Sequence, residues 1–131
     1  NQYNEIKKHK SFYNECLNHK KLLKKLLLTL KKQNKKVVGY GASTKGNVLL
    51  QFCGINSKII NNIAEVNKYK FNRYTPGSKI KIVSEKSVKL KKPDYMLVLP
   101  WHFKDYIVKR ERNFLKNGGK LIFPLPEIEI V

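Results

Sequence analysis

Residues 36–49 read KVVGYGASTKGNVL, and the order of patterns within them sets the kind of fold that this chain adopts. An apolar run ends at Tyr40, a glycine turn follows, and a helical pattern begins directly after the turn. Gly39 and Gly41 provide the Cβ-free backbone that so tight a turn needs. The first helical turn, whose N–H groups have no partner within the helix, then holds the amides of Ser43, Thr44 and Lys45. These features predict a buried strand that leads to a helix N-terminus able to receive a phosphate.

The glycine spacing matches neither standard phosphate-binding motif. The third glycine, Gly46, comes two residues later than the dinucleotide fingerprint requires, which disfavours an NAD-dependent oxidoreductase. Asn47 and Val48 stand where the P-loop has its Lys-Ser/Thr pair. Lys45 nevertheless places a cation where the helix dipole repels it unless a bound anion compensates. We therefore favour an anion site over the alternative, a purely structural tight turn.

The segment before this turn has the pattern of one long amphipathic helix, from residue 3 to about residue 33. Its apolar residues recur at helical spacing, with lysines on the other face: Ile6, Tyr13, Leu17, Leu23, Leu27 and Leu30. A rise of 1.5 Å per residue makes this helix roughly 45 Å long, more than the width of a small domain. We expect residues 1–34 to form the helix, with first turns that project toward a flanking domain or end in solvent. Residues 35–131 then form the domain on which it packs.

Strand and helix patterns alternate after the turn. We expect helices near residues 45–53, 84–90 and 102–115, and further strands near residues 59–66, 80–83, 95–99 and 120–126. This alternation predicts an α/β fold, a small doubly wound parallel sheet of about five strands joined by right-handed crossovers. Pro124 and Pro126 cannot donate ladder hydrogen bonds, so the last strand must lie near an edge or finish early.

The 131 residues suffice for one domain with a real core. No apolar run approaches the roughly 20 residues that span a bilayer, and the lysine-rich start has no signal-peptide layout. We therefore expect a cytoplasmic protein that does not associate with a membrane. Cys16 and Cys53 lack C-x-x-C spacing, which favours ordinary thiols over disulfides or zinc ligands. His9 and His19 lie on the long helix without metal-ligand spacing, so we expect exposed side chains and no metal site.

The composition is strongly basic, with 28 Lys and Arg against 9 Asp and Glu and a net charge of +19. Such a charge ordinarily indicates nucleic acid as a partner. Arginine, which base readout and bidentate phosphate recognition favour, occurs only at Arg73, Arg110 and Arg112, and the lysines spread over every segment. We therefore expect nucleic acid to bind only non-specifically. A non-catalytic nucleotide or nucleic-acid-binding module is the alternative function.

Ligands of doubly wound sheets bind beyond the carboxyl ends of the strands, where the strand order reverses. Residues 41–45, 65–67 and 100–103 are expected to converge there. Glu65 lies about twenty residues past the glycine turn, where dinucleotide folds place the acid that binds the ribose hydroxyls. A solvated carboxylate paired with a neighbouring lysine, Lys68 or Lys70, is an equal alternative.

Two further pairs of residues are candidates for this crevice. Arg73 and Tyr74 precede a Thr-Pro-Gly turn and form a cationic, aromatic corner that can clamp a phosphate or stack a base. Trp101 can wall a pocket, although a place in the core is its more usual role. His102 can act as a general base or cap the following helix. Because no Ser-His-Asp, Cys-His or paired-carboxylate constellation is visible, catalytic residues stay unassigned and the chain has the features of a binding domain.

Four strings occur in the same order as in one known family: VVGYGASTKGNVLLQFCGI, NKYKFNRYTPGSKIKIVS, KPDYMLVLPWHFKDYI and GGKLIFPLPEIEIV. From about residue 36 to the last residue, the chain resembles the C-terminal domain of SAM-dependent sugar-nucleotide C-methyltransferases. The family pattern is approximately GYGAxxKGNTLLN, the RYTPG loop, IPIVSPE, KPDYVLILPWN and GGxFVVPIPxPxV. The long leading helix also has a counterpart there.

The resemblance implies a Rossmann-like domain without a SAM site of its own, which helps to hold a dTDP-linked 4-keto sugar against a companion SAM-binding domain. The family's chemistry is deprotonation beside the keto group, followed by attack of the enolate on the methyl sulfonium. The family's zinc cysteines, SAM domain and principal base have no counterpart in these residues. The resemblance therefore implies a piece of a larger enzyme, or a domain fused to other sugar-nucleotide modules, that is inactive alone.

Site residues carry over by position. The resemblance places Ser43, Lys45, Gly46 and Asn47 at the phosphates, with Arg73, Tyr74, Trp101 and His102 nearby. Our interpretation of the glycine turn and the strand ends adds Gly41, Thr44 and Glu65 to the substrate-binding candidates. His102 stands where the family more often has Asn, which implies a polar contact in place of a catalytic base.

Overall fold

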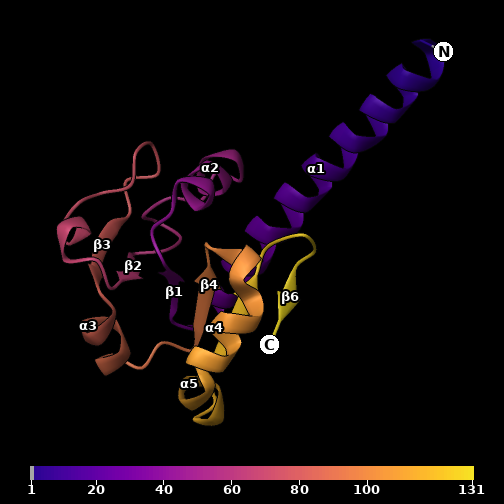
Figure 1. Cartoon of the computed structure of the whole chain (residues 1–131). Helices are drawn as coiled ribbons and strands as arrows, with labels where there is room; N and C mark the ends of the chain where they lie inside the picture. Colours follow the sequence, from indigo (N-terminus) through magenta and orange to yellow (C-terminus); the bar gives the residue numbers. More distant parts are fainter. Residues whose placement is uncertain (1) are drawn as a thin grey trace.

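A computed structural model describes residues 2–131. The chain forms one mixed sheet of six strands in the order β3-β2-β1-β4-β5-β6 (Figure 1). The strands are β1 (Val37–Tyr40), β2 (Asn62–Glu65), β3 (Lys81–Ser84), β4 (Tyr95–Val98), β5 (Lys120–Phe123) and β6 (Glu129–Ile130). The first five run parallel to their neighbours, whereas β6 runs antiparallel to β5.

The helices are α1 (Gln2–Lys32), α2 (Thr44–Phe52), α3 (Glu85–Leu90), α4 (Lys104–Arg110) and α5 (Arg112–Lys116). Two single 3₁₀ turns, η1 (Lys68–Lys70) and η2 (Trp101–Phe103), lie in the loops after β2 and β4. Within residues 2–131, no helix combines the length and the apolar character of a membrane span. The α/β fold with a long N-terminal helix, predicted from the sequence, is confirmed.

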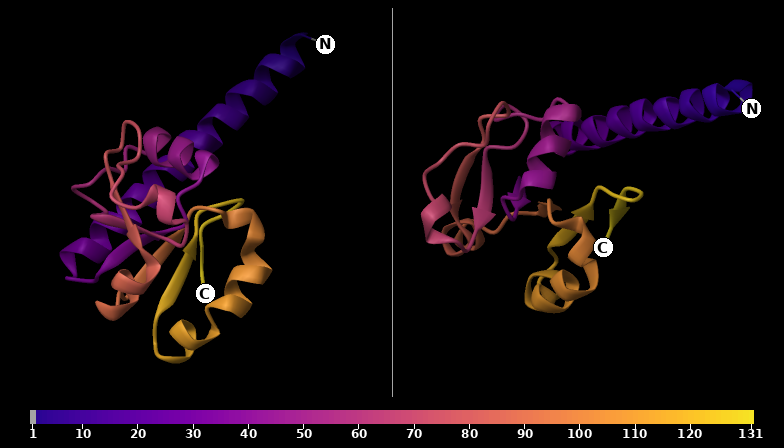
Figure 2. Two further views of the ribbon diagram at one scale, coloured as in Figure 1. Left: turned by 60° about the vertical axis from the view of Figure 1, so that its left-hand side comes forward. Right: turned by 45° about the horizontal axis from the view of Figure 1, so that its top comes forward.

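Only the second half of α1 belongs to the core. Leu23, Leu27 and Leu30 are buried, whereas the side chains of Ile6 and Tyr13 are 55% and 63% exposed. The first half of the helix projects away from the sheet in every view (Figures 1 and 2). The projecting turns therefore present apolar side chains on an otherwise lysine-rich surface.

Helices cover both faces of the sheet. On one face, leucines of α1 and α2 pack with Ile63 of β2 and Leu97 of β4. On the other face, Ile107 of α4 packs with Met96 of β4 and Phe123 of β5. A strand buried on both faces needs no polar side, which explains the unbroken apolar run of β4.

The sequence-based prediction of about five parallel strands missed β6. Strand β5 does finish early, at Phe123, because Pro124 cannot extend the ladder. The chain then turns back, and β6 pairs antiparallel with β5 through Ile130 opposite Ile122. A strand of two exposed residues has too little hydrophobic alternation to be visible in a sequence.

Two other predicted elements differ from the structure. The helix expected at 102–115 divides into η2, α4 and α5, with the break at Glu111, whose side chain turns into the interior. The strand expected at 59–66 is shorter, because Ile59 and Ile60 form a turn in which both amides donate to the carbonyl of Asn56. The side chains of this turn are apolar because they pack toward the core. An apolar stretch in a sequence does not by itself distinguish such a turn from a strand.

Candidate functional site

The strand order reverses at β1, which has β2 on one side and β4 on the other. A hollow of about 390 Å³ lies at the carboxyl ends of these strands. It is lined by Gly41 after β1, Glu65 of β2, and Pro100 and Phe103 after β4. Each of the three stretches expected to converge at this edge therefore contributes to one crevice.

The first turn of α2 follows the glycine turn directly, but none of its residues lines this crevice; Lys45 lines a different hollow, on the α1 side of the sheet. Ser43 is the N-cap residue, and its Oγ accepts a hydrogen bond from the amide of Gly46 at 3.0 Å. The intrahelical ladder begins with the amide of Asn47, which donates to the Ser43 carbonyl at 2.9 Å. The amides of Thr44 and Lys45 precede this point, and both residues are exposed. The helix N-terminus thus keeps donors that can bind an anion, although the amide of Gly46 already serves the cap.

Gly46 also allows α2 to approach the sheet closely. A Cβ on this residue would lie 2.5 Å from Cβ of Leu99 and 2.9 Å from Oγ of Ser43. Gly41 has a φ of +79°, and a Cβ there would meet Pro100 Cδ at 2.9 Å. Gly41 is needed for the backbone geometry at the crevice, and Gly46 for the close packing of α2 on the end of β4, which are roles that glycines fill in nucleotide-binding turns.

Glu65 holds the glycine turn from inside the crevice. Its carboxylate accepts hydrogen bonds from the backbone amides of Ala42 at 3.1 Å, Val66 at 2.7 Å and Asn67 at 2.9 Å. Its Oε1 lies 3.7 Å from Nζ of Lys70, so the expected pairing with a neighbouring lysine is present. The ribose contact stays a prediction, since a carboxylate oxygen can accept more than one hydrogen bond.

Lys70 is a site residue that the sequence interpretation treated only as a partner of Glu65. Its Nζ donates to the carbonyl of Ala42 at 2.7 Å, so its cation sits on the glycine turn itself. Lys45 lies in the first turn of α2, on the exposed side. Lys45 therefore adds positive potential at the helix N-terminus, whereas the charge of Lys70 is paired with that of Glu65 on the glycine turn.

The loop that holds Arg73 and Tyr74 docks on α2. The side-chain amide of Gln51 donates to the carbonyl of Pro76 at 2.6 Å, and the Ser78 hydroxyl donates to Oδ1 of Asn47 at 3.4 Å. Arg73 and Tyr74 are exposed, and neither lines the 390 Å³ crevice. Asn47 thus ties the loop to the helix, and its predicted phosphate contact would be additional to this bond.

Trp101 and His102 separate at the end of β4. Trp101 is half-buried and packs against both apolar clusters, as expected for a core residue. It also lines a second hollow of about 430 Å³ between α1 and α2, together with Lys45. His102 is exposed, with its ring centroid 4.2 Å from that of Phe103. It does not cap the following helix, because the N-cap of α4 is Phe103 and no side chain bonds there.

The prediction of an exposed His19 is wrong. Its side chain is half-buried, and Nε2 lies 2.5 Å from the carbonyl oxygen of Pro124. The sequence could not indicate this contact, since the two residues are 105 positions apart. Among residues 2–131, no group of three or more His, Cys, Asp or Glu side chains is placed to hold a metal ion.

A buried charge network lies behind the crevice, and sequence reasoning missed it. Glu111 is 1% exposed, and its carboxylate meets Tyr40 Oη at 2.9 Å, Lys89 Nζ at 2.7 Å and Arg110 Nη1 at 2.9 Å. Burial, reinforced by Glu111, raises the pKa of Tyr40 well above its ordinary value. Because Tyr40 and Arg110 also line the crevice, this network gives the crevice a rigid polar wall.

The network predicts a loss of stability in acid. Burial raises the pKa of Glu85, but hydrogen bonds from Lys89 and Arg110 outweigh burial, so that the pKa lies below its ordinary value of 4.5. A lowered folded-state pKa adds stability above pH 4.5 that is lost as the pH falls through the folded pKa. We expect Glu85→Gln to lower the free energy of unfolding near pH 6 but to leave it almost unchanged near pH 3. Urea unfolding of both proteins at the two pH values measures this difference in free energy of unfolding. A loss of stability that is equal at pH 6 and pH 3 would contradict the prediction.

The fold and this edge define a class of protein: a small α/β domain with a largely apolar crevice and a glycine turn that opens onto a helix at the carboxyl ends of its parallel strands. The sequence profile of the C-methyltransferase C-terminal domain matches residues 1–126. The chain belongs to this family. It is similar to the C-methyltransferase NovU of Streptomyces niveus, with 39% identity over 97 residues. That match covers 74% of this chain but only 23% of the relative, so the chain spans about a quarter of its relative's length.

Proposed function

We propose that this domain binds the nucleotide sugar of a C-methyltransferase, a dTDP-linked 4-keto sugar, while a companion domain binds SAM and carries the reacting methyl group. The proposal combines the membership in the C-terminal-domain family with the crevice geometry. The order of the five parallel strands, 3-2-1-4-5, also supports a Rossmann-like fold, in which ligands bind at the point where the order reverses.

The observation that carries the proposal is the first turn of α2. Its amides at Thr44 and Lys45 precede the hydrogen-bond ladder, Lys45 adds a cation there, and Lys70 bonds to the preceding glycine turn while paired with Glu65. A diphosphate has the two features that this turn accommodates, negative charge and several acceptor oxygens. The diphosphate would lie over Ser43, Thr44 and Lys45, and Arg73 would approach it from the docked loop.

The remaining candidates would orient the rest of the substrate. Trp101 shares a hollow with Lys45 and offers an apolar wall to a sugar or base. His102 would make a polar contact, and Glu65 would accept from a hydroxyl while it holds the turn. SAM, bound by the companion domain, supplies the electrophilic methyl group. The contribution of this chain is to bind and orient the substrate, which lowers the entropic part of the barrier.

Removal of Lys45 is expected to weaken nucleotide-sugar binding. Isothermal titration of the full chain with dTDP is expected to give saturable binding, which Lys45→Ala weakens about tenfold through the loss of one charge-assisted contact. Lys8→Ala removes the same charge from an exposed site on the projecting helix and is expected to leave the affinity unchanged. An equal loss of dTDP affinity in both variants, or the absence of saturable dTDP binding to the parent chain, would contradict the proposal.

The net charge of +19 favours a second candidate, a non-catalytic nucleotide or nucleic-acid-binding module. It predicts that single-stranded DNA binds with a steep salt dependence, and that dTDP has no advantage over other nucleotides. Titration of both ligands at low and physiological salt separates the two candidates.

A further inference from the structure

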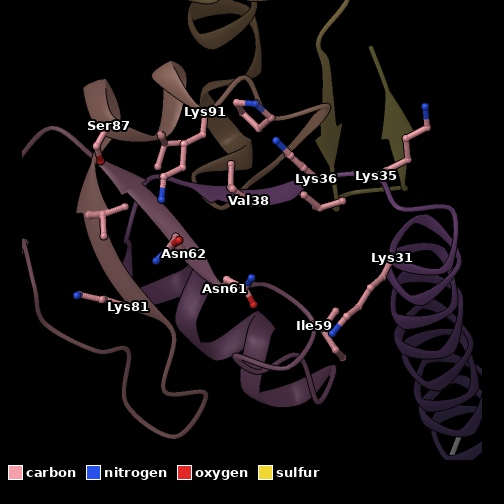
Figure 3. Close-up of a pocket in the computed structure, with 14 residues that line it drawn as sticks. Lys31, Lys35, Lys36, Val38, Ile59, Asn61, Asn62, Lys81, Ser87 and Lys91 are labelled. Carbon is pink, nitrogen blue, oxygen red and sulfur yellow. The ribbon is translucent and has the colours of Figure 1, made fainter.

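A hollow lined by several lysines lies at the opposite edge of the sheet, at the amino ends of β1, β2 and β3 (Figure 3). Its volume is about 510 Å³, which suits a small molecule. We call it the lysine pocket, after the basic residues that line it: Lys31, Lys35, Lys36, Lys81 and Lys91. Of the residues that the structure describes, no aspartate or glutamate lines it.

The lysines reach this pocket from separate elements. Lys31 belongs to the last turn of α1, Lys36 precedes β1, Lys81 opens β3, and Lys91 is the C-cap of α3. Figure 3 shows Lys36 and Lys91 on opposite sides of Val38, with Asn62 below Lys91. The cations are therefore brought together by the tertiary fold and not by one lysine-rich segment.

The local charges leave the pocket positive. Helices α1 and α3 both end at its rim, and each C-terminus carries roughly half a negative charge. Together they contribute about one negative charge. Lys31 Nζ donates to the carbonyl of Lys58, and Figure 3 shows the Lys35 side chain directed away from the hollow, so Lys36, Lys81 and Lys91 are the lining lysines whose charge exceeds this negative charge. The nearby carboxylate of Asp94 accepts from the backbone amide of Lys36 at 2.7 Å, so it is held by the main chain. An anion that enters the pocket therefore gains from a net positive potential.

The neutral side chains indicate the kind of anion. The side-chain amide of Asn62 can donate hydrogen bonds, whereas the hydroxyl of Ser87 already donates to the carbonyl of Ser84 at 2.8 Å. Val38, Val83 and Val88 form an apolar wall. A small organic phosphate matches both parts, because its phosphate can pair with the lysine ammonium groups and its carbon skeleton can pack against the valine wall. We propose that the lysine pocket binds a small phosphate ester, at a site separate from the crevice at the carboxyl ends of the strands.

Amide chemical shifts of the full chain test this inference. Ribose 5-phosphate is expected to give saturating shifts at Asn62, Lys81 and Ser87, and to bind more tightly than inorganic phosphate, which lacks the carbon body. The double variant Lys36→Ala/Lys91→Ala is expected to weaken this binding about tenfold or more, since two charge-assisted contacts are lost. Both side chains are exposed, so an unchanged melting temperature verifies that the fold is intact.

The double variant Lys8→Ala/Lys21→Ala removes the same charge from exposed positions on α1 and serves as the matched control. It is expected to weaken ribose 5-phosphate binding less than about twofold, through the general field alone. Three results would each overturn the inference: shifts that do not saturate, equal losses in the two double variants, or tighter binding of octathymidylate with shifts spread over the lysine-rich surface. Binding of dTDP is followed through the amide chemical shifts of Thr44 and Lys45. The result for the lysine pocket is therefore independent of the result for the proposed nucleotide-sugar site.

Discussion

Gly46→Val is expected to lower the free energy of unfolding by about 3 kcal/mol, since it both overpacks the core and disturbs a helix cap. A Cβ at this position would lie 2.5 Å from Cβ of Leu99, far inside van der Waals contact, and neither atom is at the end of a flexible side chain. The same Cβ would lie 2.9 Å from Oγ of Ser43, the atom that caps α2. Helix α2 must therefore move away from the end of β4.

Equilibrium urea unfolding of the variant measures the loss of stability. Val48→Ala, at a 61% exposed position of the same helix, is the matched control and is expected to change stability by less than about 0.5 kcal/mol. A Gly46→Val protein as stable as the parent would show that α2 is not held against Leu99. Because the displaced helix carries the proposed anion site, the variant is also expected to lose dTDP binding.

Glu111→Ala is expected to cost about 3 kcal/mol, the lower end of what breaking a buried charge network costs. The carboxylate is 1% exposed and joins Tyr40, Lys89 and Arg110. Its removal leaves a polar cavity and takes a hydrogen-bond partner from the buried Tyr40 hydroxyl. The side chains of Lys89 and Arg110 are 39% and 36% exposed and can regain water, which keeps the loss at that lower end.

An exposed ion pair provides the contrast. Lys104 and Glu129 are 2.5 Å apart, with side chains 38% and 55% exposed. Glu129→Ala is expected to change stability by less than about 1 kcal/mol, because water screens the pair. Thermal unfolding of both variants in the same buffer gives the comparison. Equal losses at Glu111 and Glu129 would mean that burial of the network contributes nothing.

Local patterns made much of the fold predictable. The glycine turn with its following helix, the Ser84 cap of α3 and the apolar run of β4 are all present as expected. Each depends on residues within a few positions of one another, so periodicity and capping rules are sufficient. The alternation of strands and helices likewise identified an α/β fold, because parallel strands need a long crossover that is usually a helix. Between β2 and β3 the crossover is a loop that contains only η1.

The candidate site was predictable as a place but not as a set of contacts. That residues near 41, 65 and 100 meet follows from the parallel sheet alone. That Glu65 accepts from the amide of Ala42, or that Asn47 bonds to Ser78, depends on side-chain directions that the sequence does not contain. These contacts decide which donors of the glycine turn are free for a ligand.

Short-range patterns were therefore enough to establish a family, an α/β fold and the sheet edge where a ligand is expected. Tertiary structure alone buried Glu111, added the short strand β6 and gathered Lys31, Lys36 and Lys91 around one hollow. The physical reason is the range of the forces involved. Helix caps and hydrophobic periodicity act between neighbours in the chain, whereas burial and charge clustering depend on which distant segments the sheet order places side by side.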